Sequence, residues 1–210
     1  MANGTRLRIL LVGASGTLGR AVAAELGQRH DVVTAGRSGG DVRIDIGDAA
    51  SVISAIEQAG PIDALACAAG SVNFRPLEAI APAGIADSVY ALGLANKLLG
   101  QVNLALAARG TLRDGGSITL IGGILAEVPI VAGSSASMVN GALEAFVRAA
   151  AIELPRGLRI NVVSPTLLTE SVPSFGPFFR GFEPVTAARA ALAYSRSIEG
   201  KETGQVFRVF

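Results

Sequence analysis

Three glycines stand at intervals of three residues, Gly13, Gly16 and Gly19, between a short apolar run and a stretch with helical spacing. Glycine adopts backbone torsions that other residues resist, and it leaves room for an anion beside the chain. The amides that open a helix attract negative charge, which the helix dipole also favours. The spacing therefore predicts a turn that holds the pyrophosphate of a dinucleotide, although a tight strand-to-helix turn would use the same glycines. Of the residues between these glycines, we expect Ser15, Thr17 and Leu18 to contact the cofactor.

The end of the next apolar run indicates which dinucleotide is bound. Sites for NAD usually carry an acidic residue there, which accepts hydrogen bonds from the ribose hydroxyls. Here Gly36 stands in the place of that acid, and Arg37 and Ser38 follow it. A guanidinium pairs with a phosphate group, and a hydroxyl can add a hydrogen bond. We therefore expect NADP(H) as the cofactor, the alternative being that Arg37 is a solvated loop residue.

Strands and helices must bring these residues together in space. The patterns typical of strands and of helices alternate along the chain. Short apolar runs predict buried strands at 7–13, 31–36, 42–46, 61–70, 115–123, 158–165 and 204–209. Helical spacing predicts helices at 16–29, 48–60 (with Asp48 as N-cap), 84–109, 134–154 and 185–200. The alternation predicts one α/β domain over residues 1–210, a doubly wound, Rossmann-like parallel sheet of about seven strands with helices on both faces. Such sheets bind ligands beyond the carboxyl ends of their strands.

Composition narrows the class of protein and of partner. Half of the 210 residues are apolar, 17% are charged and the mean hydropathy is +0.48, which excludes a disordered chain. The formal net charge is +1 without a basic block, so neither nucleic acid nor a membrane is an expected partner. The single cysteine, Cys67, cannot form an internal disulfide, and a cytoplasmic location is expected. We expect no metal site, because no His, Cys and Asp cluster has the spacing of metal ligands.

Further motifs follow the glycine turn. Asp45 and Ile46 end the third predicted strand, and Cys67-Ala68-Ala69-Gly70 at the end of the fourth is a degenerate form of the motif N-N-A-G. Residues 142–154 read ALEAFVRAAAIEL, and residues 159–168 read RINVVSPTLL. With these motifs the chain resembles the short-chain dehydrogenase/reductase (SDR) superfamily over nearly its full length. The resemblance implies that Asp45 and Ile46 contact the adenine. It also implies cofactor contacts at Ala68, Ala69, Gly70, Pro165 and Leu168.

The catalytic positions of the superfamily hold different residues in this chain. Members use a tyrosine as general acid/base, a lysine that lowers its pKa and holds the nicotinamide ribose, and a serine that steadies the substrate carbonyl. The register of the helix at 134–154 puts Ala136 at the tyrosine and Asn140 at the lysine, and counting back puts Gly122 and Gly123 at the serine pair. An alanine cannot exchange a proton, so the usual mechanism is not expected.

Lys97 offers one compensation. The family places an asparagine in an N-x-x-G pattern on the preceding helix, and here that pattern reads Lys97-Leu98-Leu99-Gly100. We hypothesise a reciprocal exchange in which Lys97 fills the space of the family lysine and Asn140 supports it, the alternative being a Lys97 that extends to solvent. Tyr90, seven residues earlier, would share a helical face with Lys97 and is the candidate acid, although an ordinary half-buried tyrosine fits the same position.

Three functions fit these features. The first is an NADP(H)-dependent oxidoreductase that acts on a small carbonyl, alcohol or enone by an atypical mechanism. The second is a non-redox cyclase or isomerase with an apolar cleft lined by the phenylalanines of 173–182, and the third is a catalytically inactive NADP(H)-binding sensor. SDR members commonly assemble, so the resemblance implies a homodimer or homotetramer through the helices at 84–109 and 134–154.

Overall fold

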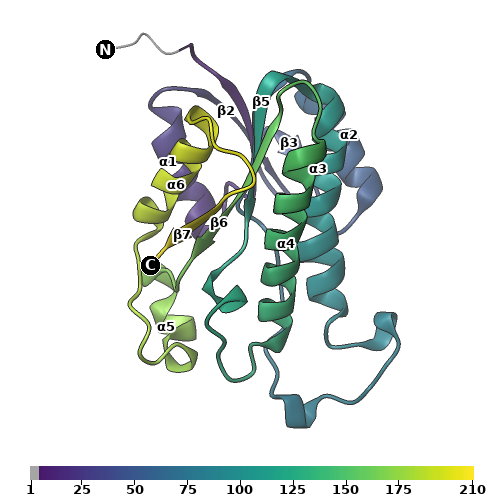
Figure 1. Cartoon of the computed structure of the whole chain (residues 1–210), viewed down its shortest axis with the longest axis vertical. Helices are drawn as coiled ribbons and strands as arrows, with labels where there is room; N and C mark the ends of the chain where they lie inside the picture. The colour runs from purple at the N-terminus through teal and green to yellow at the C-terminus, as the bar shows by residue number, and fades with distance from the viewer. Residues whose placement is uncertain (1–4) are drawn as a thin grey trace.

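The computed structural model describes residues 5–210, so residues 1–4 of the predicted domain lie outside the described part of the chain. Seven parallel strands form one sheet in the order β3-β2-β1-β4-β5-β6-β7 (Figure 1). Their bounds are β1 Arg8–Val12, β2 Asp31–Gly36, β3 Val42–Arg43, β4 Ile62–Cys67, β5 Leu112–Ile121, β6 Arg159–Pro165 and β7 Val206–Val209. The order reverses between β1 and β4, which creates the switch point where such sheets bind ligands.

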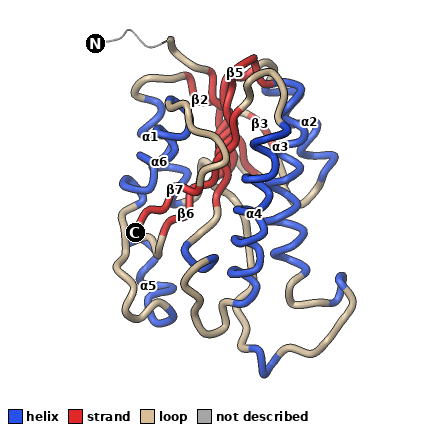
Figure 2. The backbone as a smooth tube through the Cα atoms, viewed as in Figure 1, coloured by secondary structure: helices blue, strands red, loops and turns tan. Residues whose placement is uncertain are grey.

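Helices cover both faces of the sheet, which confirms the predicted fold class. Helices α1 and α6 lie on one face, and α2, α3 and α4 lie on the other (Figures 1 and 2). The bounds are α1 Thr17–Gly27, α2 Ala49–Ala59, α3 Gly100–Thr111, α4 Ser134–Glu153, α5 Val172–Phe175 and α6 Ala187–Glu199. Asp48 caps α2 as predicted, because its carboxylate accepts a hydrogen bond from the Ala50 amide at 2.9 Å.

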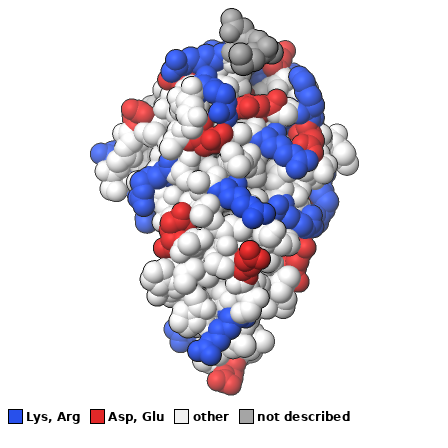
Figure 3. All heavy atoms as spheres, turned by 90° about the vertical axis from the view of Figure 1, so that its left-hand side faces the viewer, with Lys and Arg blue, Asp and Glu red and all other residues white. Residues whose placement is uncertain are grey.

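The core lies between these layers. In β1 the side chains of Ile9, Leu10 and Leu11 are all fully buried, as expected of a central strand that is covered on both faces. This double cover explains why the strands read as continuous apolar runs rather than as alternating patterns. Among residues 5–210, no helix is both long enough and apolar enough to cross a membrane. On the side that carries α1 and α6, acidic and basic side chains are interspersed (Figure 3).

The predicted helix at 84–109 begins later than expected. Residues 85–87 form one 3-10 turn, and the continuous helix starts only at 91, runs as a π-helix over Gly93–Leu99 and continues as α3. Pro82 and Gly84 disfavour helix before this point, and the Ser88 hydroxyl accepts a hydrogen bond from the Tyr90 amide at 3.1 Å. Tyr90 therefore precedes the helix, and the prediction that it shares a helical face with Lys97 is wrong.

Candidate functional site

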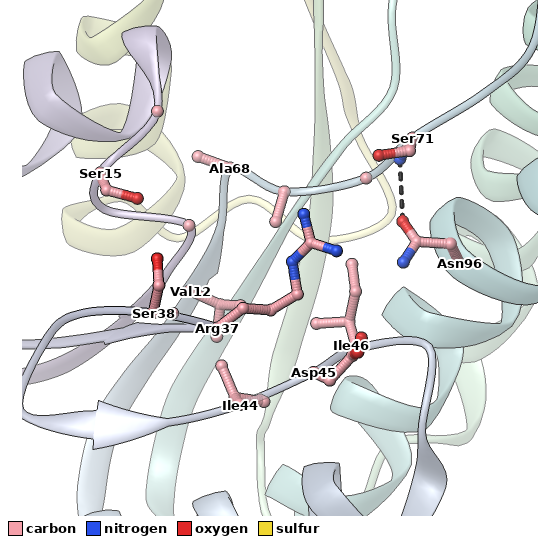
Figure 4. Close-up of a pocket in the computed structure, with 15 residues that line it drawn as sticks. Val12, Ser15, Arg37, Ser38, Ile44, Asp45, Ile46, Ala68, Ser71 and Asn96 are labelled. Atoms are coloured by element: carbon pink, nitrogen blue, oxygen red, sulfur yellow. Dashed lines mark hydrogen bonds between the residues drawn. The ribbon is translucent and has the colours of Figure 1, made fainter.

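Two cavities lie at the carboxyl ends of the strands. The first has a volume of about 260 Å³ and is lined from the ends of β1, β2 and β4 and from the segment after β3 (Figure 4). The second has a volume of about 210 Å³ and is lined from the ends of β5 and β6, from α4 and from α5. A dinucleotide that lay across the switch point between β1 and β4 would reach from one cavity to the other.

The glycine turn joins β1 to α1 beside the first cavity. Gly13 has φ +86°, and a Cβ at this position would lie 2.9 Å from the Ala69 Cβ and 3.0 Å from the Ala68 carbonyl oxygen. At Gly19 a Cβ would fall on the Gly13 carbonyl oxygen, so this glycine lets α1 pack closely against the turn. The first turn of α1 has no side-chain cap and no acidic residue. Its amides are therefore available to an anion, and the turn fits a pyrophosphate.

Asp45 and Ile46, which follow β3, line another part of the first cavity. Ile46 is buried, and the Asp45 carboxylate accepts a hydrogen bond from the Gly47 amide at 2.9 Å. From the π-helix, the side-chain Oδ1 of Asn96 accepts a hydrogen bond from the Ser71 amide at 2.9 Å (Figure 4). Asn96 thus ties the π-helix to the segment that follows β4 and borders the cavity at the same time.

Arg37 extends into the first cavity from the end of β2, and its guanidinium lies between the segments that carry Ala68 and Ile46 (Figure 4). No ion pair forms at Arg37 within the part of the chain that the structure describes. The acid nearest in sequence, Asp41, accepts hydrogen bonds from the Thr34 amide and hydroxyl, which lower the pKa of Asp41. The guanidinium therefore retains its hydrogen-bonding capacity for a ligand.

Lys97 borders the second cavity and does not extend to solvent. Its Nζ donates a hydrogen bond to the Gly122 carbonyl oxygen at 2.9 Å. The stem packs on Gly70, which has φ +150° and where a Cβ would lie only 2.7 Å from the Lys97 Cγ. Burial lowers the pKa of Lys97 to about 8, because the interior disfavours the charged amine. Gly70 thus makes the space that the lysine needs.

Asn140 approaches the same turn from α4. Its Nδ2 donates a hydrogen bond to the Gly123 carbonyl oxygen at 3.2 Å, so Lys97 and Asn140 bind consecutive carbonyls after β5. The Asn140 Oδ1 is buried without a partner among the described residues, as is the Thr166 hydroxyl, and both residues line the second cavity. Buried polar atoms without partners are rare, and their position beside a cavity indicates that a ligand completes their hydrogen bonds.

No tyrosine borders either cavity within residues 5–210. Ala136 is buried in an apolar cluster with Ile124 and Leu125. The Tyr90 hydroxyl lies 3.2 Å from the Ser134 hydroxyl at the start of α4. Tyr194 is fully buried, and its hydroxyl donates a hydrogen bond to the Cys67 carbonyl oxygen at 2.7 Å. Burial raises the pKa of the Tyr194 phenol well above its ordinary value, so this side chain is a structural group.

The two cavities bring together most of the residues that the sequence selected. The first is lined by Gly13, Ser15, Gly16, Gly36, Arg37, Ser38, Asp45, Ile46, Ala68, Ala69 and Gly70. The second is lined by Lys97, Gly122, Gly123, Ala136, Asn140, Pro165 and Leu168. Thr17, Leu18 and Gly19 form the first turn of α1 and do not line the first cavity. No group of three or more potential ligands for a metal ion occurs in the described residues.

The lining residues that sequence reasoning missed include Ser71 and Asn96 in the first cavity and Phe74 and Thr166 in the second. Thr166 carried a signal, since it directly follows Pro165 within the segment 159–168 that carries the family resemblance. Asn96 precedes Lys97 in the π-helix, and the two neighbours reach different cavities. Phe74 lies in a loop without a periodic pattern, so no sequence signal could place it.

Comparison with known proteins agrees with this geometry. A family model described as enoyl-(acyl carrier protein) reductase matches residues 3–207. The crystal structure of the protein lin1944 from Listeria innocua is 48% identical, with a TM-score of 0.93 over 97% of this chain and 100% of that chain. A search of curated proteins finds no match.

More distant structures share the fold. A small-chain dehydrogenase in complex with NADPH is 24% identical, with a TM-score of 0.84 over 98% of this chain and 97% of that chain. A dehydrogenase/reductase from Sinorhizobium meliloti 1021 is 23% identical, with a TM-score of 0.80 over 99% of this chain and 95% of that chain. Because the family match covers nearly the whole chain and the glycine turn has the expected geometry, the protein belongs to the short-chain dehydrogenase/reductase superfamily.

Proposed function

We propose that the protein is an NADP(H)-dependent oxidoreductase that acts on a small carbonyl, alcohol or enone. The observation that carries this proposal is Arg37, a guanidinium without an ionic partner among the described residues, extended into a cavity beside a phosphate-binding turn (Figure 4). Gly36 leaves the end of β2 without the carboxylate that would repel a 2′-phosphate. Arg37 would pair with that phosphate and Ser38 would add a hydroxyl contact.

The second cavity suits the nicotinamide half of the same cofactor. Pro165 and Leu168 would border the nicotinamide ring, and the Lys97 ammonium would donate a hydrogen bond to one of the two hydroxyls of its ribose. The Asn140 Oδ1, buried without a partner in the described chain, would accept a hydrogen bond from one of those hydroxyls. Lys97 and Asn140 would share the task that the superfamily gives to one lysine. When bound, the nicotinamide supplies hydride chemistry.

The absence of a phenol at position 136 favours a second candidate, a protein that binds NADP(H) without turnover and reports cofactor state. In this case Ala136 and its apolar neighbours would be packing only. The two functions differ in one measurable respect, because both bind the cofactor and only the first oxidises or reduces it. Consumption of NADPH with a carbonyl acceptor supports the first, and binding without consumption by any carbonyl, alcohol or enone supports the second.

We also propose that copies of the chain associate through α3 and α4. Leu106 on α3 is 49% exposed and Ile152 on α4 is 87% exposed, and an apolar hollow lies between the two helices. Burial of such side chains against a second copy stabilises an assembly. Sedimentation of the protein and of an Ile152→Glu variant tests this. We expect the variant to sediment with a lower molecular mass than the unchanged protein, whereas equal molecular masses would contradict the proposal.

Titration with NADPH and with NADH, followed by nicotinamide fluorescence, tests the proposed cofactor. We expect tighter binding of NADPH, and we expect Arg37→Gln to weaken binding of NADPH while it leaves NADH nearly unchanged. The matched control is Arg43→Gln, since Arg43 is exposed on the neighbouring β3 and does not line the first cavity. Equal affinity for the two cofactors would contradict the NADP(H) preference, and no binding of either would overturn the oxidoreductase proposal.

A further inference from the structure

Most of the side chains that line the second cavity are apolar, and three of them are phenylalanines. Phe74, from the loop after β4, contacts Phe175 of α5 with ring centroids 5.9 Å apart. Phe179 also lines the cavity and meets Phe182 edge-on, with centroids 5.3 Å apart. Aromatic side chains pack most favourably on other planar rings in offset or edge-on contacts. The walls therefore suit a planar, uncharged ring system.

Proton donors are scarce in this cavity. Among the described residues that line it, none carries a carboxyl, imidazole, thiol or phenol group. Thr166 and Ser171 supply aliphatic hydroxyls, which are weak acids. Among these described residues Lys97 carries the only charge. One N–H of its ammonium is bound to the Gly122 carbonyl oxygen, and after one contact to the nicotinamide ribose a third N–H remains for an anion. The cavity can thus stabilise a negative oxygen better than it can protonate one.

We infer that the substrate reduced in the second cavity is a quinone rather than a simple ketone. This inference rests on the proposed function and narrows it to one substrate class. Its basis is the combination of aromatic walls, Ala136 in the place of a phenolic acid, and a lone ammonium held at the end of β5.

The chemical reason is the basicity of the product. A ketone that accepts hydride becomes an alkoxide, whose conjugate acid is about as weak an acid as water, so the reaction depends on a proton donor. A quinone that accepts hydride becomes a phenolate, and a phenol has a pKa of about 10. The phenolate can leave unprotonated or take its proton from water. Loss of the tyrosine therefore impairs ketone reduction far more than quinone reduction.

The reaction balances without a protein acid. The quinone accepts two electrons and one hydrogen as hydride from the reduced nicotinamide dinucleotide, which is oxidised. One quinone oxygen becomes a phenolate beside the Lys97 ammonium, and water supplies the second proton of the quinol. No bond forms to the protein.

A matched pair of substrates tests the inference. Methylnaphthoquinone and tetralone have similar two-ring frames, but the first is a quinone and the second a ketone. Both reactions are measured anaerobically with saturating NADPH, and the rate without protein is subtracted. We expect kcat/KM for the quinone to exceed kcat/KM for the ketone by roughly 100-fold or more, because a general acid usually contributes a factor of this size. Reduction of tetralone within tenfold of the quinone would overturn the inference.

Calorimetric titration of methylnaphthoquinone into the protein gives a readout that does not depend on turnover. We expect Phe175→Ala to weaken this binding, and Phe178→Ala, at an exposed residue that does not line the cavity, to leave it unchanged. Equal effects of the two variants would contradict the proposed ring site. A failure of NADPH to bind would overturn the proposed function as well, whereas NADPH binding with equally fast reduction of tetralone would overturn only the quinone inference.

Discussion

Replacement of Lys97 by methionine is expected to stabilise the fold at neutral pH. The chain has two lysines, and Lys97 is the less exposed one, half-buried at the edge of the second cavity. Burial lowers the pKa of Lys97 from its ordinary value of 10.5 to about 8. A pKa difference of one corresponds to about 1.4 kcal/mol, so the charged amine destabilises the folded state by about 3 kcal/mol relative to the unfolded chain.

The net effect is smaller than this charge penalty. Methionine fills a similar volume but cannot donate a hydrogen bond to the Gly122 carbonyl oxygen, whose loss costs about 1–2 kcal/mol. The remaining gain is about 1–2 kcal/mol, which for a domain of this size raises Tm by roughly 2–8 °C. Lys201→Met is the matched control, since Lys201 is exposed, and we expect no change from it.

The stabilisation by Lys97→Met should depend on pH in a way that identifies its cause. The folded pKa of Lys97 lies below the unfolded one, so between pH 8 and 10.5 the unfolded chain binds more protons and the penalty is relieved as pH rises. Below pH 8 the penalty is constant. Cys67, whose pKa is raised from 9.0 to about 12 by burial, acts in the opposite direction above pH 9. The informative quantity is therefore the difference between the variant and the unchanged protein.

Denaturant unfolding of the unchanged protein and of both variants at pH 7, 8, 9 and 10 measures this difference. We expect the advantage of Lys97→Met to be largest at pH 7 and to shrink toward pH 10. A variant that is less stable at pH 7, or an advantage that does not depend on pH, would refute the assignment of a buried charged amine at this position.

Three further predictions follow from the site. Turnover that needs the Lys97 ammonium should fall as pH rises through about 8, and a profile that stays flat to pH 9.5 would contradict that role. Gly70→Ala would place a Cβ 2.7 Å from the Lys97 Cγ, so we expect this variant to bind NADPH more weakly in a fluorescence titration. The control Gly39→Ala adds a methyl group in open space and should not change the affinity for NADPH. Equal affinities of the two variants would show that the stem of Lys97 moves freely. Tyr194→Phe removes the hydroxyl that donates a hydrogen bond to the buried Cys67 carbonyl oxygen, so we expect the free energy of unfolding to fall by about 1–3 kcal/mol. A loss below about 0.5 kcal/mol in denaturant unfolding would argue against this hydrogen bond.

The fold and the residues that line the first cavity were predictable because their signals are local. Gly13 and Gly19 stand beside the strand and the helix that they join, and Arg37 directly follows its strand. The environment of Lys97 was not local, since it depends on Gly70 and Gly122, which are distant in sequence. Tyr90 was misplaced because apolar spacing continued through a segment that Pro82 and Gly84 keep out of the helix.

The strand order also affects how the protein can fold while it is being synthesised. Every residue that lines the first cavity, with the exception of Asn96, lies between Val12 and Ser71. The strands β1 to β4 are adjacent in the sheet, so this third of the chain can assemble its part of the sheet before β5 is synthesised. A nascent chain arrested after β4 would carry nearly the whole contact surface for the adenosine half of a dinucleotide. The ligand would then act as a template for folding during translation, and its supply would set the yield of folded protein.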